Sequence, residues 1–237
     1  MILPSSLAGF EKIPVIQKIN SMSFIEREGA VYIVEPWASL RGIFEYVACV
    51  EFAKERLLNL PKGKALGSIN ITPARYDSAS MVFFAQASLD NLAVWLNGAF
   101  ELGLKGNNIS FYKDKIKPAL ETKHGRFSSV LQKYAPFIAN LNAYRMEWLH
   151  RLAGGAEIYS DKAPSDSGAN ISIQVPIDPT IPSLASQPSL YLERIQKVQH
   201  ENGGRWLIPI DEFAQYIRAK TIELVIEILE VTVEARA

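Results

Sequence analysis

Apolar residues recur at helical spacing in three long stretches of the chain, at 40–57, 72–103 and 211–234. Pro36 and Pro73 stand where the first turns of the first two helices are expected, since a proline there loses no helical hydrogen bond. The middle stretch carries apolar residues on further sides as well, which predicts a central helix that is buried over most of its circumference. The three apolar stripes are Leu40, Phe44, Val47, Val50 and Leu57; Met81, Phe84, Ala85, Leu89, Leu92, Ala93, Leu96 and Phe100; and Phe213, Ile217, Leu224, Ile228 and Val231.

Proline and glycine mark weaker elements between these stretches. Pro118 is expected to separate two short helical pieces within 105–133. Pro136 is expected to open a further helix, which Gly154-Gly155 stops. Near the N-terminus the signals are weak, apart from a β-like run at 31–34. The helix after Pro136 contains the apolar residues Phe137, Ile138, Leu141, Tyr144, Trp148, Leu149 and Leu152.

Alternation of apolar and other residues replaces helical spacing in 156–189. The segment 158–160 offers a partner strand across a turn-rich connection to the alternating run of Ile171, Ile173, Val175 and Ile177. Four prolines make the remainder irregular, and 191–200 is moderately helical. We therefore expect a mostly α fold, a helical bundle in a single domain over 1–237, with a small β-hairpin insertion at about 155–189 before the last helices.

Charge and composition exclude several classes of protein. The 25 basic residues balance the 25 acidic ones, so no global field attracts nucleic acid or an anionic membrane. An apolar share of 48% over 237 residues is sufficient for a buried core. Cys49 has no partner in the chain, which excludes an intrachain disulfide and fits a reducing compartment. The first residues lack a signal-peptide pattern, and polar residues interrupt the most apolar stretch, 81–100, so we expect a cytoplasmic protein without a membrane span.

Arg145 and His150 are five positions apart, late on the helix expected after Pro136, in Asn142-Ala-Tyr-Arg-Met-Glu-Trp-Leu-His-Arg151. Histidine moves protons near neutral pH and arginine holds a phosphate with a fixed fork of donors, so the pair supplies what metal-free cleavage of a phosphodiester requires. Five positions amount to about 500° of helical rotation, so the two side chains point roughly 140° apart. They converge on one ligand if the arginine bends back or if a second copy of the helix faces the first. The spacing therefore favours a site at an interface between two chains.

The Arg-x4-His spacing, after a long helix with polar interruptions, resembles the motif of the HEPN superfamily of RNases, and the resemblance rests mainly on 142–151. It implies an all-α fold, a homodimer that brings two motifs into one cleft, and no metal or other cofactor. His150 would then be the general acid or base at the ribose 2′-hydroxyl, and Arg145 would contact the scissile phosphate of RNA, leaving 2′,3′-cyclic phosphate ends. The resemblance also implies a toxin or defence context, with an antitoxin or nucleotidyltransferase as partner. Met146 departs from the family pattern, in which a polar residue often follows the arginine, and this departure bears on catalysis more than on fold.

Polar residues near the motif are expected to support it. Asp90 and Asn91 interrupt the helix expected to be most buried, where an unpaired carboxylate is costly. A charge-assisted bond from Arg145 to Asp90 would remove that cost, either as support for the site or as a structural tether. The expected supporting residues are Asp90, Asn91, Asn142 and Tyr144.

The segment 105–133 has seven basic residues against two acidic ones and offers contacts to RNA phosphates. The alternative is a solvated loop surface. The expected RNA-binding residues are Lys113, Lys115, Lys117, Lys123 and Arg126, together with Arg151 beside the motif.

Other interpretations of the motif stay open. His150 at the end of an apolar helix also suits a C-terminal cap, because the helix dipole favours an imidazolium there, and Arg145 also suits an interhelical ion pair. Arg194 and His200 form a second match, with five residues between them. If Arg145 and His150 have only these structural roles, the chain would be a non-catalytic helical dimerisation or ligand-binding module. His124 and His200 have no companions at metal-ligand spacing, and no phosphate loop or nucleophile elbow is present in the sequence.

Overall fold

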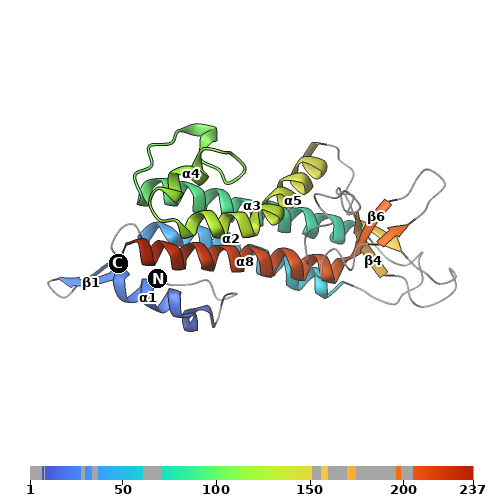
Figure 1. Ribbon diagram of the computed structural model, residues 1–237. Coiled ribbons are helices and arrows are strands. Elements are labelled where there is room, and N and C mark those ends of the chain that lie inside the picture. The colour runs from blue at the N-terminus through green and yellow to red at the C-terminus, as the bar shows by residue number, and fades with distance from the viewer. Residues whose placement is uncertain are drawn as a thin grey trace. The chain divides into compact units, whose positions relative to one another are not determined.

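Helices make up most of the described chain, so the expected mostly α fold is confirmed (Figure 1). The computed structural model describes residues 7, 9–27, 30–33, 37–60, 71–150, 156–159, 170–174, 196–198 and 205–236. Its α-helices are α1 (Pro14–Ser23), α2 (Arg41–Leu58), α3 (Thr72–Ala99), α4 (Ile116–Glu121), α5 (Arg126–His150) and α8 (Ile210–Ala235). Short 3-10 turns lie at Phe10–Lys12, Trp37–Leu40 and Gly106–Asn108. None of the helices in this part of the chain has the length and apolar character needed to cross a membrane.

The three strong apolar stripes correspond to α2, α3 and α8, whose stripe residues are mostly buried. α3 ends at Ala99, four residues before the expected end at Gly103. The reason is a local hydrogen-bond pattern: the Leu102 N–H donates to the Asn97 carbonyl and the Glu101 N–H donates to the Gly98 carbonyl, at 3.0 and 3.1 Å. This pair of bonds closes the helix with Glu101 in the left-handed conformation.

The expected role of two prolines was wrong. Pro136 does not open a helix but lies inside α5, which begins ten residues earlier at Arg126. Buried Leu131, Tyr134 and Phe137 continue one apolar face past the proline, so packing outweighs the hydrogen bond that the proline cannot donate. Pro118 likewise lies inside α4, in its first turn, where it costs no hydrogen bond.

Contacts along the chain divide it into two compact units. Unit 1 consists of 1–51, 84–138 and 220–237, and unit 2 consists of 52–83 and 139–219. Each of the four long helices α2, α3, α5 and α8 contributes residues to both.

Aromatic contacts mark the core of unit 1. The ring centroids of Trp37 and Trp95 are 5.7 Å apart, and Phe100 meets the ring of Phe127 edge-on at 5.5 Å. Such pairs stabilise a core by about 0.5–1.5 kcal/mol beyond the area they bury. The unit also contains an antiparallel strand pair, β1 (Phe24–Arg27) and β2 (Ala30–Ile33). β2 matches the expected β-like run, whereas α1 and β1 lie in a region where the sequence signals were weak.

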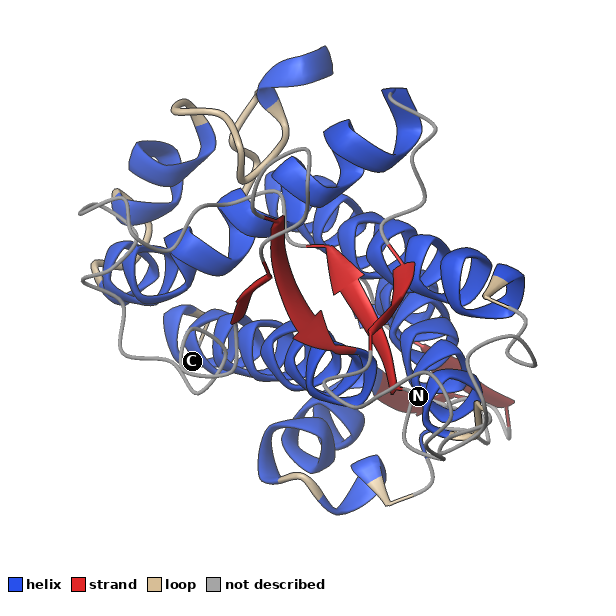
Figure 2. Ribbon diagram, turned by 90° about the vertical axis from the view of Figure 1, so that its right-hand side faces the viewer, coloured by secondary structure: helices blue, strands red, loops and turns tan. Residues whose placement is uncertain are grey.

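Unit 2 contains a four-stranded antiparallel sheet in the order β3-β4-β6-β5, whose strands lie side by side in Figure 2. The strands are β3 (Ala156–Tyr159), β4 (Asn170–Gln174), β5 (Gln196–Val198) and β6 (Arg205–Pro209). Ile158 pairs with Ile171, so the expected hairpin is confirmed, and Ile173 pairs with Ile208. The expected boundary at 189 was wrong, because β5 and β6 extend the β structure to Pro209. The helical expectation for 191–200 was also wrong at 196–198, where β5 pairs with β6.

Candidate functional site

The end of α5 carries the Arg-x4-His motif in unit 2. Tyr144 is fully buried and meets Phe213 of α8 edge-on, with ring centroids 5.4 Å apart. Burial raises the pKa of Tyr144 well above its ordinary value, and the neighbouring Tyr216 adds to the shift. The next two residues, Arg145 and Met146, are exposed. A buried aromatic anchor therefore fixes this turn of the helix while the guanidinium is left accessible.

Arg145 forms no ion pair with any residue that the structure describes. Asn142, also on α5, is half-buried. His150 closes the helix, but its side chain and the whole of Arg151 lie outside the described residues. Among the described residues, the positive charge of Arg145 is thus exposed and not neutralised by an ion pair.

Asp90 and Asn91 are less buried than their place in the central helix predicted. Asn91 is exposed and donates from Nδ2 to the Ala87 carbonyl of its own helix at 2.8 Å. Asp90 is half-buried and accepts a bond of 3.4 Å from the Ser110 hydroxyl. Both residues belong to unit 1, whereas Arg145 belongs to unit 2, and the pairing of Asp90 with Arg145 stays a prediction.

The basic segment before α5 is largely accessible in unit 1. Lys113, Lys115 and Lys123 are exposed and Lys117 is half-buried, and none of the four forms an ion pair among the described residues. Arg126 differs, because it pairs with Glu234 of α8. The hydrogen bond that Arg126 donates to Glu234 raises the pKa of the Arg126 guanidinium, and the charges of Glu234 and other nearby carboxylates act in the same direction. The four lysines are thus better candidates for phosphate contacts than Arg126.

A polar cluster links α5 to α8 in unit 1. The Tyr134 hydroxyl donates to Glu227 at 2.6 Å, and the Lys133 ammonium pairs with the same carboxylate. Lys220 pairs with Glu223 at 2.7 Å, and the ammonium groups of Lys133 and Lys220 lie 4.9 and 6.0 Å from the centroid of the Tyr134 ring. Burial and the Glu227 hydrogen bond raise the pKa of Tyr134 well above its ordinary value, so this phenol stays a donor. We assign the cluster to stability rather than to chemistry.

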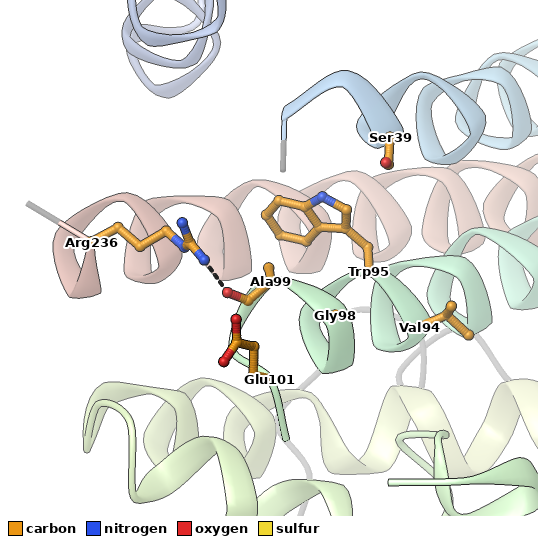
Figure 3. Close-up of a pocket in the computed structure, with 7 residues that line it drawn as sticks. All are labelled: Ser39, Val94, Trp95, Gly98, Ala99, Glu101 and Arg236. Atoms are coloured by element: carbon orange, nitrogen blue, oxygen red, sulfur yellow. Dashed lines mark hydrogen bonds between the residues drawn. The ribbon is translucent and has the colours of Figure 1, made fainter. Parts of the chain in front are cut away.

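A surface hollow of about 450 Å³ lies at the C-terminal end of α3 and was not expected from the sequence (Figure 3). In Figure 3 the Arg236 guanidinium reaches the Ala99 carbonyl, to which it donates a hydrogen bond, with Glu101 on one side of Ala99 and Trp95 on the other. The early end of α3 brings Glu101 to this position. No sequence signal connects Arg236 with residues 94–101, because the two segments are distant in the chain. The hollow is lined by Ser39, Val94, Trp95, Gly98, Ala99, Glu101 and Arg236.

Within the described residues, no group of three or more histidine, cysteine, aspartate or glutamate side chains is placed to hold a metal ion. Comparisons of the chain with protein-family models, with curated proteins and with solved structures found no match. The site at the end of α5 therefore rests on its own residues and their geometry.

Proposed function

We propose that the protein is a HEPN-like RNase or RNA-binding protein that acts through Arg145 and His150 at an interface between two copies of the chain. The observation that carries the proposal is the exposure of Arg145 on the last turns of α5, directly after the buried anchor Tyr144. An arginine held this way keeps its fork of donors free for a phosphate. His150 supplies the proton transfer at the ribose 2′-hydroxyl.

The rotation between the two positions supports a shared site. Both residues lie on one unbroken helix, so the divergence of roughly 140° expected from their spacing applies. In a two-fold dimer, Arg145 of one copy faces His150 of the other, and one phosphate reaches both. The exposed Met146 beside the arginine gives such an interface an apolar contact.

Lysine side chains in unit 1 support a polyanionic ligand. Lys113, Lys115, Lys117 and Lys123 carry positive charges that no described carboxylate neutralises by an ion pair. These charges act on any nucleic acid without regard to sequence. They add affinity and not selectivity.

The direct test is cleavage of single-stranded RNA by the purified chain in the presence of EDTA. We expect products with 2′,3′-cyclic phosphate ends, and a loss of at least about 100-fold in rate for His150→Ala and for Arg145→Ala, as for other proton-transfer and phosphate-holding groups. Arg41→Ala is the matched control, since Arg41 is also exposed on a helix. His200→Ala tests the second sequence match. Equal cleavage by His150→Ala and the parent protein would reject His150 as the proton-transfer group.

A mixing experiment tests whether the site is shared. Arg145→Ala chains combined with His150→Ala chains form mixed dimers in which one of the two sites is intact, so up to about a quarter of the parental rate should return. A site contained in one chain would give no recovery. Recovery that depends on total protein concentration would identify the dimer as the active species.

Met146 favours a second candidate, a non-catalytic dimerisation or ligand-binding module. Its side chain is 49% exposed at the position where a polar residue often follows the arginine in the family that the motif resembles. An apolar side chain there suits protein contact better than transition-state stabilisation. RNA binding without cleavage, or dimerisation without either, would select this candidate.

A further inference from the structure

The hollow at the end of α3 presents one acidic and one basic side chain to the same space. Glu101 and Arg236 both line it, yet neither forms an ion pair with the other or with any other described residue. Arg236 uses one donor for the Ala99 carbonyl, and a guanidinium has five. Because these two opposite charges line one hollow without pairing, a ligand with a positive group for Glu101 and a negative group for Arg236 could pair with both.

The backbone holds Glu101 in an unusual conformation. Its φ angle is 50°, and among the described residues no other residue except glycine has a positive φ. Glycine is usual at such a helix end. Such a conformation persists only where the surroundings impose it, and it often accompanies a binding role. Here it directs the carboxylate to the rim of the hollow, beside Ala99 (Figure 3).

Beside the two charges, the lining of the hollow includes apolar residues (Figure 3). Trp95, 7% exposed, and Val94, 55% exposed, contribute ring and methyl surface. Gly98 adds no side chain, and a Cβ built there would meet no atom within 4 Å. The hollow thus has open space next to apolar surface, with a charge of each sign at its rim.

We propose that this hollow binds a free α-amino acid with an apolar side chain. The ligand's ammonium group pairs with Glu101, its carboxylate pairs with Arg236, and its side chain occupies the space above Gly98 against Val94 and Trp95. A molecule of this kind satisfies both charges and the apolar surface at once, whereas the end of a longer peptide offers one charge only. The proposal is independent of the RNA site at the end of α5.

The test is a titration of the full chain with L-leucine, followed by NMR shifts of the backbone amides of 94–101. We expect a dissociation constant of about a millimolar, as suits a ligand of about nine non-hydrogen atoms on an open surface. Two probes that each lack one charge, 3-methylbutylamine and 4-methylpentanoate, should bind at least about 10-fold more weakly. If 3-methylbutylamine bound as well as L-leucine, the pairing of the carboxylate with Arg236 would be wrong. If 4-methylpentanoate did so, the pairing of the ammonium group with Glu101 would be wrong. No shift with L-leucine would overturn the proposal.

Matched variants separate binding from folding. A Cβ atom at Gly98 meets no other atom within 4 Å, so Gly98→Leu places a side chain in the hollow and should abolish binding. Gly42→Leu, at another helical glycine with open space around its Cβ position, should bind as the parent does. Glu101→Gln and Arg236→Gln should each weaken binding about 10-fold. Unchanged affinity of Gly98→Leu, with a native melting temperature, would place the ligand elsewhere. RNA cleavage by Gly98→Leu should equal that of the parent, so a failure here and a failure of the α5 proposal are distinguishable.

Discussion

Glu101 shows how one residue can be kept at a cost to stability. The left-handed conformation is available to glycine without penalty, but a side chain with a Cβ atom pays about 1 kcal/mol for it. The nearby Gly103 also has a positive φ, so the turn already uses glycine where it is required. Glu101, two residues earlier, adopts the same region of backbone conformation although it has a Cβ atom.

Glu101→Gly should raise the free energy of unfolding by about 1 kcal/mol, because it removes the strain at φ 50°. Glu101→Ala is the matched control: it also removes the carboxylate but retains the Cβ atom, so it should gain little. Urea unfolding of both variants measures the difference. Equal stability of the two would show that backbone strain at this position is negligible.

Glu227 illustrates a carboxylate whose environment has competing effects. Burial by itself raises its pKa, but hydrogen bonds from Lys133 and Tyr134 and the charges of Lys133 and Lys220 outweigh burial, and the pKa is lowered from its ordinary value. A group with a lowered pKa in the folded state stabilises the fold at any pH above its unfolded pKa. That contribution disappears as the pH falls through the folded value.

The free energy of unfolding should therefore fall between about pH 5 and pH 3, and Glu227→Gln should remove about 1 kcal/mol of this change, a value that allows for the partial exposure of the group. Chemical denaturation at a series of pH values measures it. Glu121→Gln, at an exposed position without an ion pair among the described residues, is the matched control. An unchanged slope for Glu227→Gln would show that the cluster with Tyr134 contributes nothing to acid sensitivity.

At the scale of elements, the spacing of apolar residues and the length of the stripe that they form decided which helices were predicted correctly. α2, α3 and α8 have apolar stripes several turns long, so local spacing and tertiary burial agree. Pro136 misled because a proline marks a helix start only when no apolar face continues across it, and here the face runs on from Phe127 to Leu141. β5 has three residues and exists through its pairing with β6, a partner that no local pattern identifies.

Packing between α5 and α8 in unit 2 should be sensitive to one aromatic residue. Phe213→Ala removes the ring that meets Tyr144 and leaves a cavity at a fully buried position, which should cost about 3–5 kcal/mol in free energy of unfolding. Phe83→Ala is the matched control, because Phe83 is 52% exposed and its loss should cost well under that amount. Equal costs for the two substitutions would contradict the burial described for Phe213.

For the whole molecule, a net charge of zero conceals an uneven distribution. Exposed lysines lie around α4, while carboxylates of α8 pair with Arg126 and Lys133. Spacing in the sequence located the basic segment and the exposed Arg145, but it did not distinguish the charges that α8 neutralises from those that stay available. That distinction depends on which helices pack together.

Affinity for RNA should fall steeply with salt if the lysines around α4 contact phosphates. Replacing both Lys113 and Lys115 by alanine should reduce the slope of log K against log salt concentration by about 0.7 for each lost contact with a single strand. Lys12→Ala combined with Lys18→Ala, at exposed positions outside this segment, is the control. Binding that is flat in salt for the parent protein would show that phosphate contacts do not drive it.

The hollow at the end of α3 explains why part of the binding surface was beyond sequence reasoning. Residues 94–101 are neighbours in the chain, but the expected helix end at Gly103 lay four residues beyond the observed end at Ala99. Arg236 reaches the Ala99 carbonyl from the far end of α8, and no motif links positions so distant. Only tertiary packing brings an acid and a base together there.

The contact between Trp37 and Trp95 also has a spectroscopic consequence. Both indoles belong to unit 1, whereas Trp148 and Trp206 belong to unit 2. A chain with phenylalanine at 148 and 206 would emit from unit 1 alone, and a chain with phenylalanine at 37 and 95 would emit from unit 2 alone. Coincident fluorescence transitions of the two chains would indicate one cooperative folding unit, and separate transitions would indicate two. The positions of the four tryptophans therefore allow fluorescence to show whether the two units unfold together.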